Sequence, residues 1–115
     1  KTKVDTETIV NLLEYFTHLE HKKGKVIIDG KKIVKRTLEL LTGTFALSIV
    51  HCDSNEVFIA RSGSILHYNN KGDYSTMSGY GFKELPEGTI MKLNNKTKRW
   101  NKAGKFTFNS PFSFV

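Results

Sequence analysis

The sequence predicts an α+β fold in which two amphipathic helices pack on an antiparallel sheet. Three observations predict it: apolar residues recur at helical spacing in the first forty residues, the period changes after Gly43, and turn residues separate the short strand-like runs that follow. Helices followed by a run of strands favour helices layered on one sheet. A length of 115 residues with 38% hydrophobic residues suits one domain over residues 1–115 with a single modest core.

Residues 6–21 are predicted to form the first helix. Asp5 and Thr6 are both good N-cap residues, and one face of the following helix is apolar at the i, i+3, i+4 and i+7 positions, which are Ile9, Leu12, Leu13 and Phe16. Cationic residues and then Gly24 follow, as is typical of a helix C-terminus.

A second helix is predicted over residues 31–41. It follows a short apolar run at residues 26–28 and a turn at Asp29-Gly30. The apolar residues that recur at helical spacing are Ile33, Val34, Leu38 and Leu41. Gly43 is expected to stop this helix.

The second half of the chain is predicted to be strands. Residues 44–52 are apolar on both alternating faces, which predicts a strand covered on both sides, and a polar turn then leads to residues 56–61 as the second arm of a hairpin. Shorter strands are predicted at residues 65–68, 74–77, 89–93 and 99–101. The tail alternates like an edge strand until Pro111 interrupts it, with Phe106, Phe108, Phe112 and Phe114.

Composition excludes several classes of protein. No apolar run approaches the roughly 20 residues that cross a bilayer, and the start of the chain carries no secretion signal, so we expect a soluble, cytoplasmic chain with no membrane partner. Cys52 is the only cysteine, and therefore neither an intramolecular disulfide nor a cysteine-rich zinc site is expected. No motif in the chain calls for a cofactor.

Four short segments carry a family resemblance. Val4-Asp5-Thr6-Glu7 opens the first helix, and Leu41-Thr42-Gly43-Thr44-Phe45-Ala46 leads into the first long strand. Arg61-Ser62-Gly63-Ser64 follows the next strand, and Leu85-Pro86-Glu87-Gly88-Thr89-Ile90 turns into a later one. Together these segments resemble the C-terminal half of a class II glutamine amidotransferase domain, which belongs to the N-terminal nucleophile (Ntn) hydrolases. The resemblance covers residues 4–93.

The resemblance implies a fold, an activity and one site residue. Members of the family stack two antiparallel sheets between helical layers, an αββα sandwich, and release ammonia from glutamine. The aspartate of the first segment binds the α-amino group of glutamine, and Asp5 occupies that position here, although Val4 replaces the usual small hydroxyl residue. A carboxylate is a specific partner for an ammonium group. The alternative, that Asp5 serves only as a helix N-cap, stays open.

The reactive half of the family pattern does not occur in this sequence. It contains no N-terminal cysteine, no histidine-arginine-tryptophan-alanine-threonine segment and no asparagine-glycine pair for an oxyanion hole. We therefore expect no catalytic residue in this chain and no glutamine hydrolysis by the chain alone. The resemblance implies completion by an upstream segment or companion chain that carries the N-terminal cysteine.

Two other groups of residues are candidates for a catalytic dyad and for a metal site. His51 and Cys52 are neighbours in a strand and point to opposite faces, so a catalytic dyad is not expected, and the simpler interpretation is a strand-end histidine beside a buried structural cysteine. His18 and His21 could hold a metal together with Glu14, but without further ligands a solvated helix face is favoured and no metal site is predicted.

The charge distribution supports an alternative function. The net charge is +7, and residues 88–115 carry six basic and no acidic side chains. A non-catalytic scaffold could bind nucleic acid or an acidic protein partner through a basic C-terminal hairpin, where aromatic stacking would add to phosphate contacts, and its candidate residues are Lys96, Lys98, Arg99, Trp100 and Lys102. The ordinary alternative is an exposed hairpin whose lysines protect a sheet edge.

Overall fold

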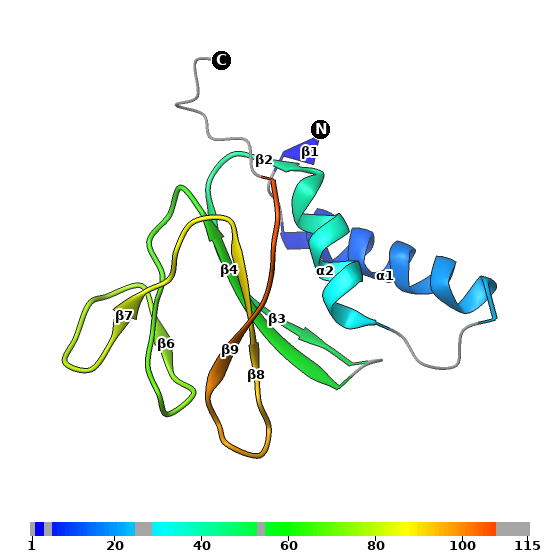
Figure 1. The fold of residues 1–115 in the computed structure, drawn as a ribbon. Helices are drawn as coiled ribbons and strands as arrows, with labels where there is room; N and C mark the ends of the chain where they lie inside the picture. Colours follow the sequence, from blue (N-terminus) through cyan, green and yellow to red (C-terminus); the bar gives the residue numbers. More distant parts are fainter. Residues whose placement is uncertain (1, 4–5, 25–28, 53–54, 108–115) are drawn as a thin grey trace.

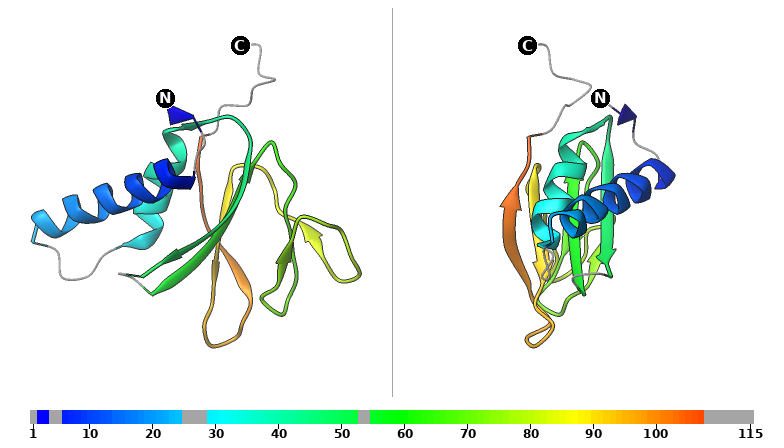
Figure 2. Two further views of the ribbon diagram at one scale, coloured as in Figure 1. Left: turned by 180° about the vertical axis from the view of Figure 1, so that it is seen from behind. Right: turned by 90° about the vertical axis from the view of Figure 1, so that its right-hand side faces the viewer.

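The computed structural model describes residues 2–3, 6–24, 29–52 and 55–107, and it confirms an α+β fold of two helices and antiparallel sheets. The helices α1 (Thr6–Lys22) and α2 (Gly30–Glu39) lie on one side of a four-stranded sheet. A smaller three-stranded sheet lies on the other side (Figure 1), and the view from behind shows the same order of layers (Figure 2).

The four-stranded sheet is antiparallel throughout, and its strands in spatial order are β3 (Phe45–His51), β4 (Glu56–Ser62), β8 (Thr89–Leu93) and β9 (Trp100–Lys105). The β3–β4 register runs from Phe45 opposite Ser62 to His51 opposite Glu56. This confirms the predicted hairpin to within one residue. The last strand is longer than the predicted residues 99–101.

Two smaller pairings complete the described strands. The three-stranded sheet consists of β6 (Tyr74–Ser75), β5 (His67–Tyr68) and β7 (Lys83–Glu84). The second pairing is parallel and joins β1 (Thr2–Lys3) to β2 (Leu41–Thr42). The sequence did not predict β1 or β7, because a strand of two residues is too short to show an alternating pattern.

The second helix differs from its prediction at both ends. It begins at Gly30 because the Asp29 carboxylate accepts a hydrogen bond from the Lys32 backbone N–H at 3.5 Å, so the predicted turn is the helix N-cap. It ends at Glu39, and the predicted end at Leu41 is wrong because the backbone of β2 pairs with β1 instead.

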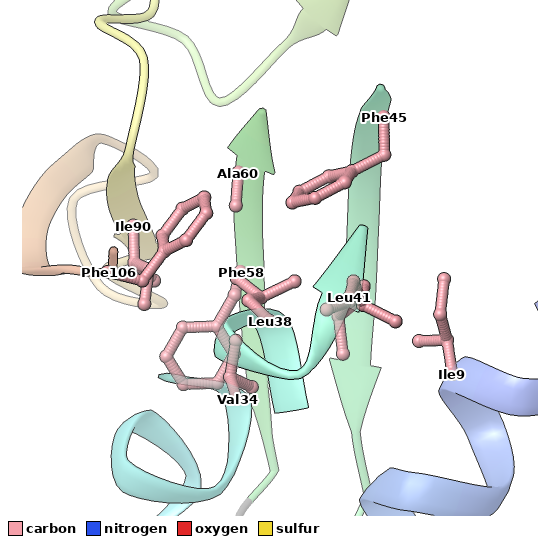
Figure 3. Close-up of a cluster of buried hydrophobic side chains, with 10 residues drawn as sticks. Ile9, Val34, Leu38, Leu41, Phe45, Phe58, Ala60, Ile90 and Phe106 are labelled. Atoms are coloured by element: carbon pink, nitrogen blue, oxygen red, sulfur yellow. The ribbon is translucent and has the colours of Figure 1, made fainter. Parts of the chain in front are cut away.

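The main core, which we call the helix-side core, fills the space between the helices and the four-stranded sheet. Figure 3 shows Phe58 of β4 beside Val34 and Leu38 of α2. The buried members of this core are Ile9, Val34, Leu38, Leu41, Phe45, Ile49, Phe58, Ala60, Ile90 and Phe106. They come from both helices and from three strands of the sheet, so this core fixes the helices on the sheet.

Phe106 directly follows β9, which lies at one end of the sheet order, and its ring is part of the helix-side core. Its ring stacks on Phe45 with centroids 5.8 Å apart, and its backbone N–H donates to the Gly88 carbonyl at 2.9 Å. The other tail phenylalanines, Phe108, Phe112 and Phe114, lie outside the described residues.

The opposite face of the four-stranded sheet carries a second core, formed by Ile59, Leu66, Leu85, Met91 and Trp100. This core lies against the three-stranded sheet and covers β4 and β8. It does not extend over all of β3, because Val50 is 66% exposed and Ser48 is also exposed. The prediction that β3 is covered on both faces therefore holds only for part of the strand.

Candidate functional site

The described parts of the four resemblance segments meet at one end of the four-stranded sheet, which we call the motif end. Asp5 itself lies outside the described residues. The elements on either side of it are β1 and α1, and β1 pairs with β2, which belongs to the second segment. In the first turns of α1, Ile9 joins the helix-side core together with Leu41 and Phe45. The described elements that flank Asp5 thus lie beside the second segment.

The third segment lies directly against the second. Phe45 forms a ladder pair with Ser62 and an isolated bridge with Gly63. Gly63 has a φ of +79°, and a Cβ there would lie 2.4 Å from Thr44 Cγ2. A side chain at this position would meet both backbone strain and a clash, so glycine is required for this contact.

The fourth segment is tied to the third by the Arg61 guanidinium. Its Nε donates to the Leu85 carbonyl at 2.5 Å, and its two terminal nitrogens donate to the Ser64 carbonyl and the Glu84 carboxylate, each at 3.2 Å. The backbone contributes as well, because the Gly88 N–H donates to the Arg61 carbonyl at 3.2 Å. Arg61 is only 13% exposed, so its bonds to the Leu85 and Ser64 carbonyls are partly shielded from water, whereas Glu84 is 56% exposed.

Glu87 and Ser62 complete the polar groups of the motif end. The Glu87 carboxylate accepts a hydrogen bond from the Gly63 N–H, which joins the fourth segment to the third a second time. Ser62 is 1% exposed, and its Oγ has no hydrogen-bond partner among the described residues. A buried hydroxyl without a partner costs free energy, so it marks a place where a group beyond the described residues could bind.

The other end of β3 carries the histidine and cysteine considered above. His51 is 6% exposed, and its Nε2 donates to Thr17 Oγ1 at 2.9 Å, since the Thr17 hydroxyl proton is directed to the Leu13 carbonyl at 2.7 Å. Cys52 is exposed, so the expectation of a buried cysteine is wrong. The inward histidine and the outward cysteine do not form a catalytic dyad.

A cavity of about 480 Å³ lies between α1 and this end of β3. Glu14, His18 and His21 line it together with His51 and Cys52. Within the described ranges, however, no three histidine, cysteine or acidic side chains are grouped closely enough to hold a metal ion. The walls that α1 and β3 contribute are largely apolar.

The predicted hairpin residues separate into three groups. Trp100 is 7% exposed, and its indole N–H donates to the Asp73 carbonyl at 3.3 Å while its ring meets Tyr74 edge to face. The ring is therefore part of the core and is not presented to a nucleobase. Lys98 and Arg99 are exposed at the tip of the hairpin, whereas Lys96 and Lys102 line an open groove beside it.

Sequence reasoning located the four segments but not the contacts between them. Arg61 was part of a scaffold motif, and nothing in the sequence indicated that it would bind Leu85 and Glu84. The orphaned Ser62 hydroxyl also gave no sequence signal, because burial of a serine at a strand end depends on tertiary packing.

Comparison with known proteins gives no further assignment. No family model, no curated protein and no solved structure matches this chain. Among the helices in the described ranges, none has the length and apolar character needed to cross a membrane. A function for this chain is therefore argued from the resemblance segments and from the geometry of the motif end.

Proposed function

We propose that this chain is the C-terminal part of a class II glutamine amidotransferase-like domain that binds glutamine at the motif end. Completed by an upstream segment or companion chain with an N-terminal cysteine, it would hydrolyse the glutamine amide and release ammonia. The observation that carries the proposal is that the second, third and fourth segments, which are separated along the sequence, lie together at one end of one sheet beside the described elements that flank Asp5.

The layer order also supports the proposal. Helices cover one face of the four-stranded sheet, and a small sheet covers part of the other face, where Val50 and Ser48 are exposed. In the αββα sandwich that we propose, the completing segment supplies the rest of the second sheet. The exposed Val50 and Ser48 side chains on this face are the part of β3 that such a segment would cover.

The outer edge of β3 gives the completing segment a place to dock. Within the described residues, β3 is at the end of the sheet order and pairs along its length with β4 alone. Its other edge offers backbone N–H and C=O groups to a further strand, and none of its seven residues is lysine or proline, the residues that commonly protect an edge. Val10 and Leu13 of α1 face the adjacent cavity and would lie over the added strand.

The chemistry assigns different tasks to the two parts. The Asp5 carboxylate binds the α-ammonium group of glutamine, and the helix that begins at the next residue fixes its position. The completing segment supplies the cysteine, whose own α-amino group acts as the base while the thiolate attacks the amide carbon. The remaining residues of this chain hold the sheet and exclude water.

Ammonia release from glutamine tests this function. We expect the full-length product of the gene, or the chain together with its companion, to release ammonia in proportion to enzyme concentration. The 115-residue chain alone should release none above the background rate, because the nucleophile is supplied by the completing segment. A completed protein that leaves glutamine intact would contradict the proposal, and so would hydrolysis by the isolated chain.

A further inference from the structure

The far end of the sheet from the motif end carries an open groove of about 850 Å³. Its walls come from the start of α2, the β3–β4 turn and the β8–β9 hairpin. Lys92 stands opposite Phe58 in the ladder and so faces the helix side of the sheet, and Asn101 is its cross-strand neighbour. These side chains therefore form the floor of the groove, beyond the first turn of α2.

Four lysines line this groove, Lys31, Lys92, Lys96 and Lys102, and we call it the lysine groove. Two carboxylates among the described residues line the groove, and both have partners: Asp29 caps α2, and Glu56 pairs with Lys92. Within the described part of the chain, Lys31, Lys96 and Lys102 take part in no ion pair. The ammonium groups of Lys31 and Lys96 are thus available to an anion, whereas Lys102 stands opposite Met91 and extends from the edge strand β9 on the face that carries the second core.

The rest of the lining indicates which anion fits. Four asparagines also line the groove, and an asparagine amide can donate a hydrogen bond to a phosphate oxygen. No aromatic side chain of the described residues lines the groove, and Trp100 lies in the core on the opposite face of the sheet. Such a surface can follow charged phosphates but cannot stack on bases. Its volume and its openness fit an extended polyanion better than a single phosphate group.

We propose that the lysine groove binds the phosphodiester backbone of a nucleic acid through its lysine and asparagine side chains, without base stacking. The site is independent of the motif end, because its residues lie at the opposite end of the sheet from the Arg61 contacts. Two properties follow. Affinity depends steeply on salt, because bound lysines displace counterions, and it depends weakly on base sequence, because no side chain reads or stacks on the bases.

Fluorescence anisotropy of a labelled oligonucleotide, single-stranded and as a duplex, tests the proposal. Contacts from Lys31, Lys92 and Lys96 predict a slope of log K against log salt of about −2 for the single strand and about −3 for the duplex. Lys31→Glu combined with Lys96→Glu is expected to weaken binding about tenfold or more and to reduce the slope by about 1.5. Each slope, divided by about 0.9 for the duplex or about 0.7 for the single strand, gives the number of phosphate contacts made with that form.

Two variants match this charge change elsewhere on the surface. Lys71→Glu with Lys83→Glu alters exposed lysines beside the three-stranded sheet, and Lys98→Glu with Arg99→Glu alters the hairpin tip. Each pair lowers the formal net charge from +7 by 4 to +3, as the groove pair does. We expect both to bind at least severalfold more tightly than the groove variant. Equal weakening by all three pairs would show attraction by net charge alone and would overturn the proposal.

Two further results would also overturn it. One is the absence of oligonucleotide binding by the unaltered chain at low salt. The other is complete displacement of the oligonucleotide by pyrophosphate at the same concentration as the oligonucleotide. That result would show a site for small anions. We expect pyrophosphate at that concentration to leave oligonucleotide binding unchanged. We also expect binding to be weakened in the groove variant but not in the two control variants.

Discussion

The two ends of the four-stranded sheet treat their polar groups in opposite ways. At the motif end, the Arg61 guanidinium makes three hydrogen bonds while only 13% exposed, and Ser62 is buried without a partner in the described residues. At the other end, Lys96 and Lys102 are exposed beside an open groove. The polar groups of the motif end are therefore buried within the fold, whereas those of the other end are solvated and available to bind an anion.

The backbone shows the same contrast. At the motif end, Gly63 lies so close to Thr44 that even a methyl group would clash. At the groove end, the hairpin turn is held by Asn94, whose side-chain oxygen accepts from the backbone N–H groups of Lys96 and Thr97. That turn is local and does not depend on distant segments, so substitutions at its exposed positions should leave the fold unchanged.

The largest expected effect is at Arg61. Arg61→Met keeps the apolar stem but removes the bonds to Leu85, Ser64 and Glu84, and we expect it to lower the free energy of unfolding by about 2–3 kcal/mol. Arg99→Met at the exposed hairpin tip is the matched control, with an expected change within about 0.5 kcal/mol. Urea unfolding of the 115-residue chain measures both. Equal changes in the free energy of unfolding for Arg61→Met and Arg99→Met would show that polar groups at the two ends of the sheet contribute equally to stability.

A much smaller effect is expected at Ser62. Because its hydroxyl is buried without a partner in the described residues, Ser62→Ala should change the free energy of unfolding of the isolated chain by less than about 0.5 kcal/mol, or stabilise it. Thr17→Val is the comparison, since it removes a buried hydroxyl that bonds both His51 and Leu13, and it should cost about 1–3 kcal/mol.

Ser62→Ala also tests whether the completing segment contacts the Ser62 hydroxyl in the completed protein. If the completing segment binds the Ser62 hydroxyl, Ser62→Ala should destabilise that protein by about 1 kcal/mol or more, although it leaves the isolated chain unaffected. Thermal or urea unfolding of both forms gives the difference. A Ser62→Ala effect of the same size in both would show that nothing from the completing segment reaches this hydroxyl.

Local patterns in the sequence were sufficient for the two helices and the β3–β4 hairpin. Ile9 and Phe16 recur at helical spacing and are buried, and the polar turn after His51 separates two strands that pair in register. Helical periodicity and strand alternation depend on neighbours close in sequence, so they can be recognised without knowing the fold.

The elements that were mispredicted depend on distant partners. Leu41 continues the apolar spacing of α2, yet its backbone pairs with β1, some forty residues earlier in the chain. Trp100 looked like an exposed stacking residue within a basic run, and only the placement of Asp73 and Tyr74 beside it shows that it is buried. Such contacts are not encoded in local spacing.

For the candidate site, the sequence supplied the four segments and the position of Asp5 before a helix. It did not supply the contacts that unite the segments at the motif end. The lysine groove was partly predicted through Lys96 and Lys102, but its other wall, Lys31 on α2, lies 65 positions before Lys96 and was not connected with the hairpin.

The Michaelis constant for glutamine in the completed protein tests the central claim most directly. Asp5→Asn removes the charge that binds the α-ammonium group but keeps a good capping residue, so the Michaelis constant should rise about ten- to a hundredfold. Asp29→Asn makes the same change at the N-cap of α2 and should leave the constant unchanged. An unaltered constant in Asp5→Asn, or an equal rise in both variants, would contradict the account.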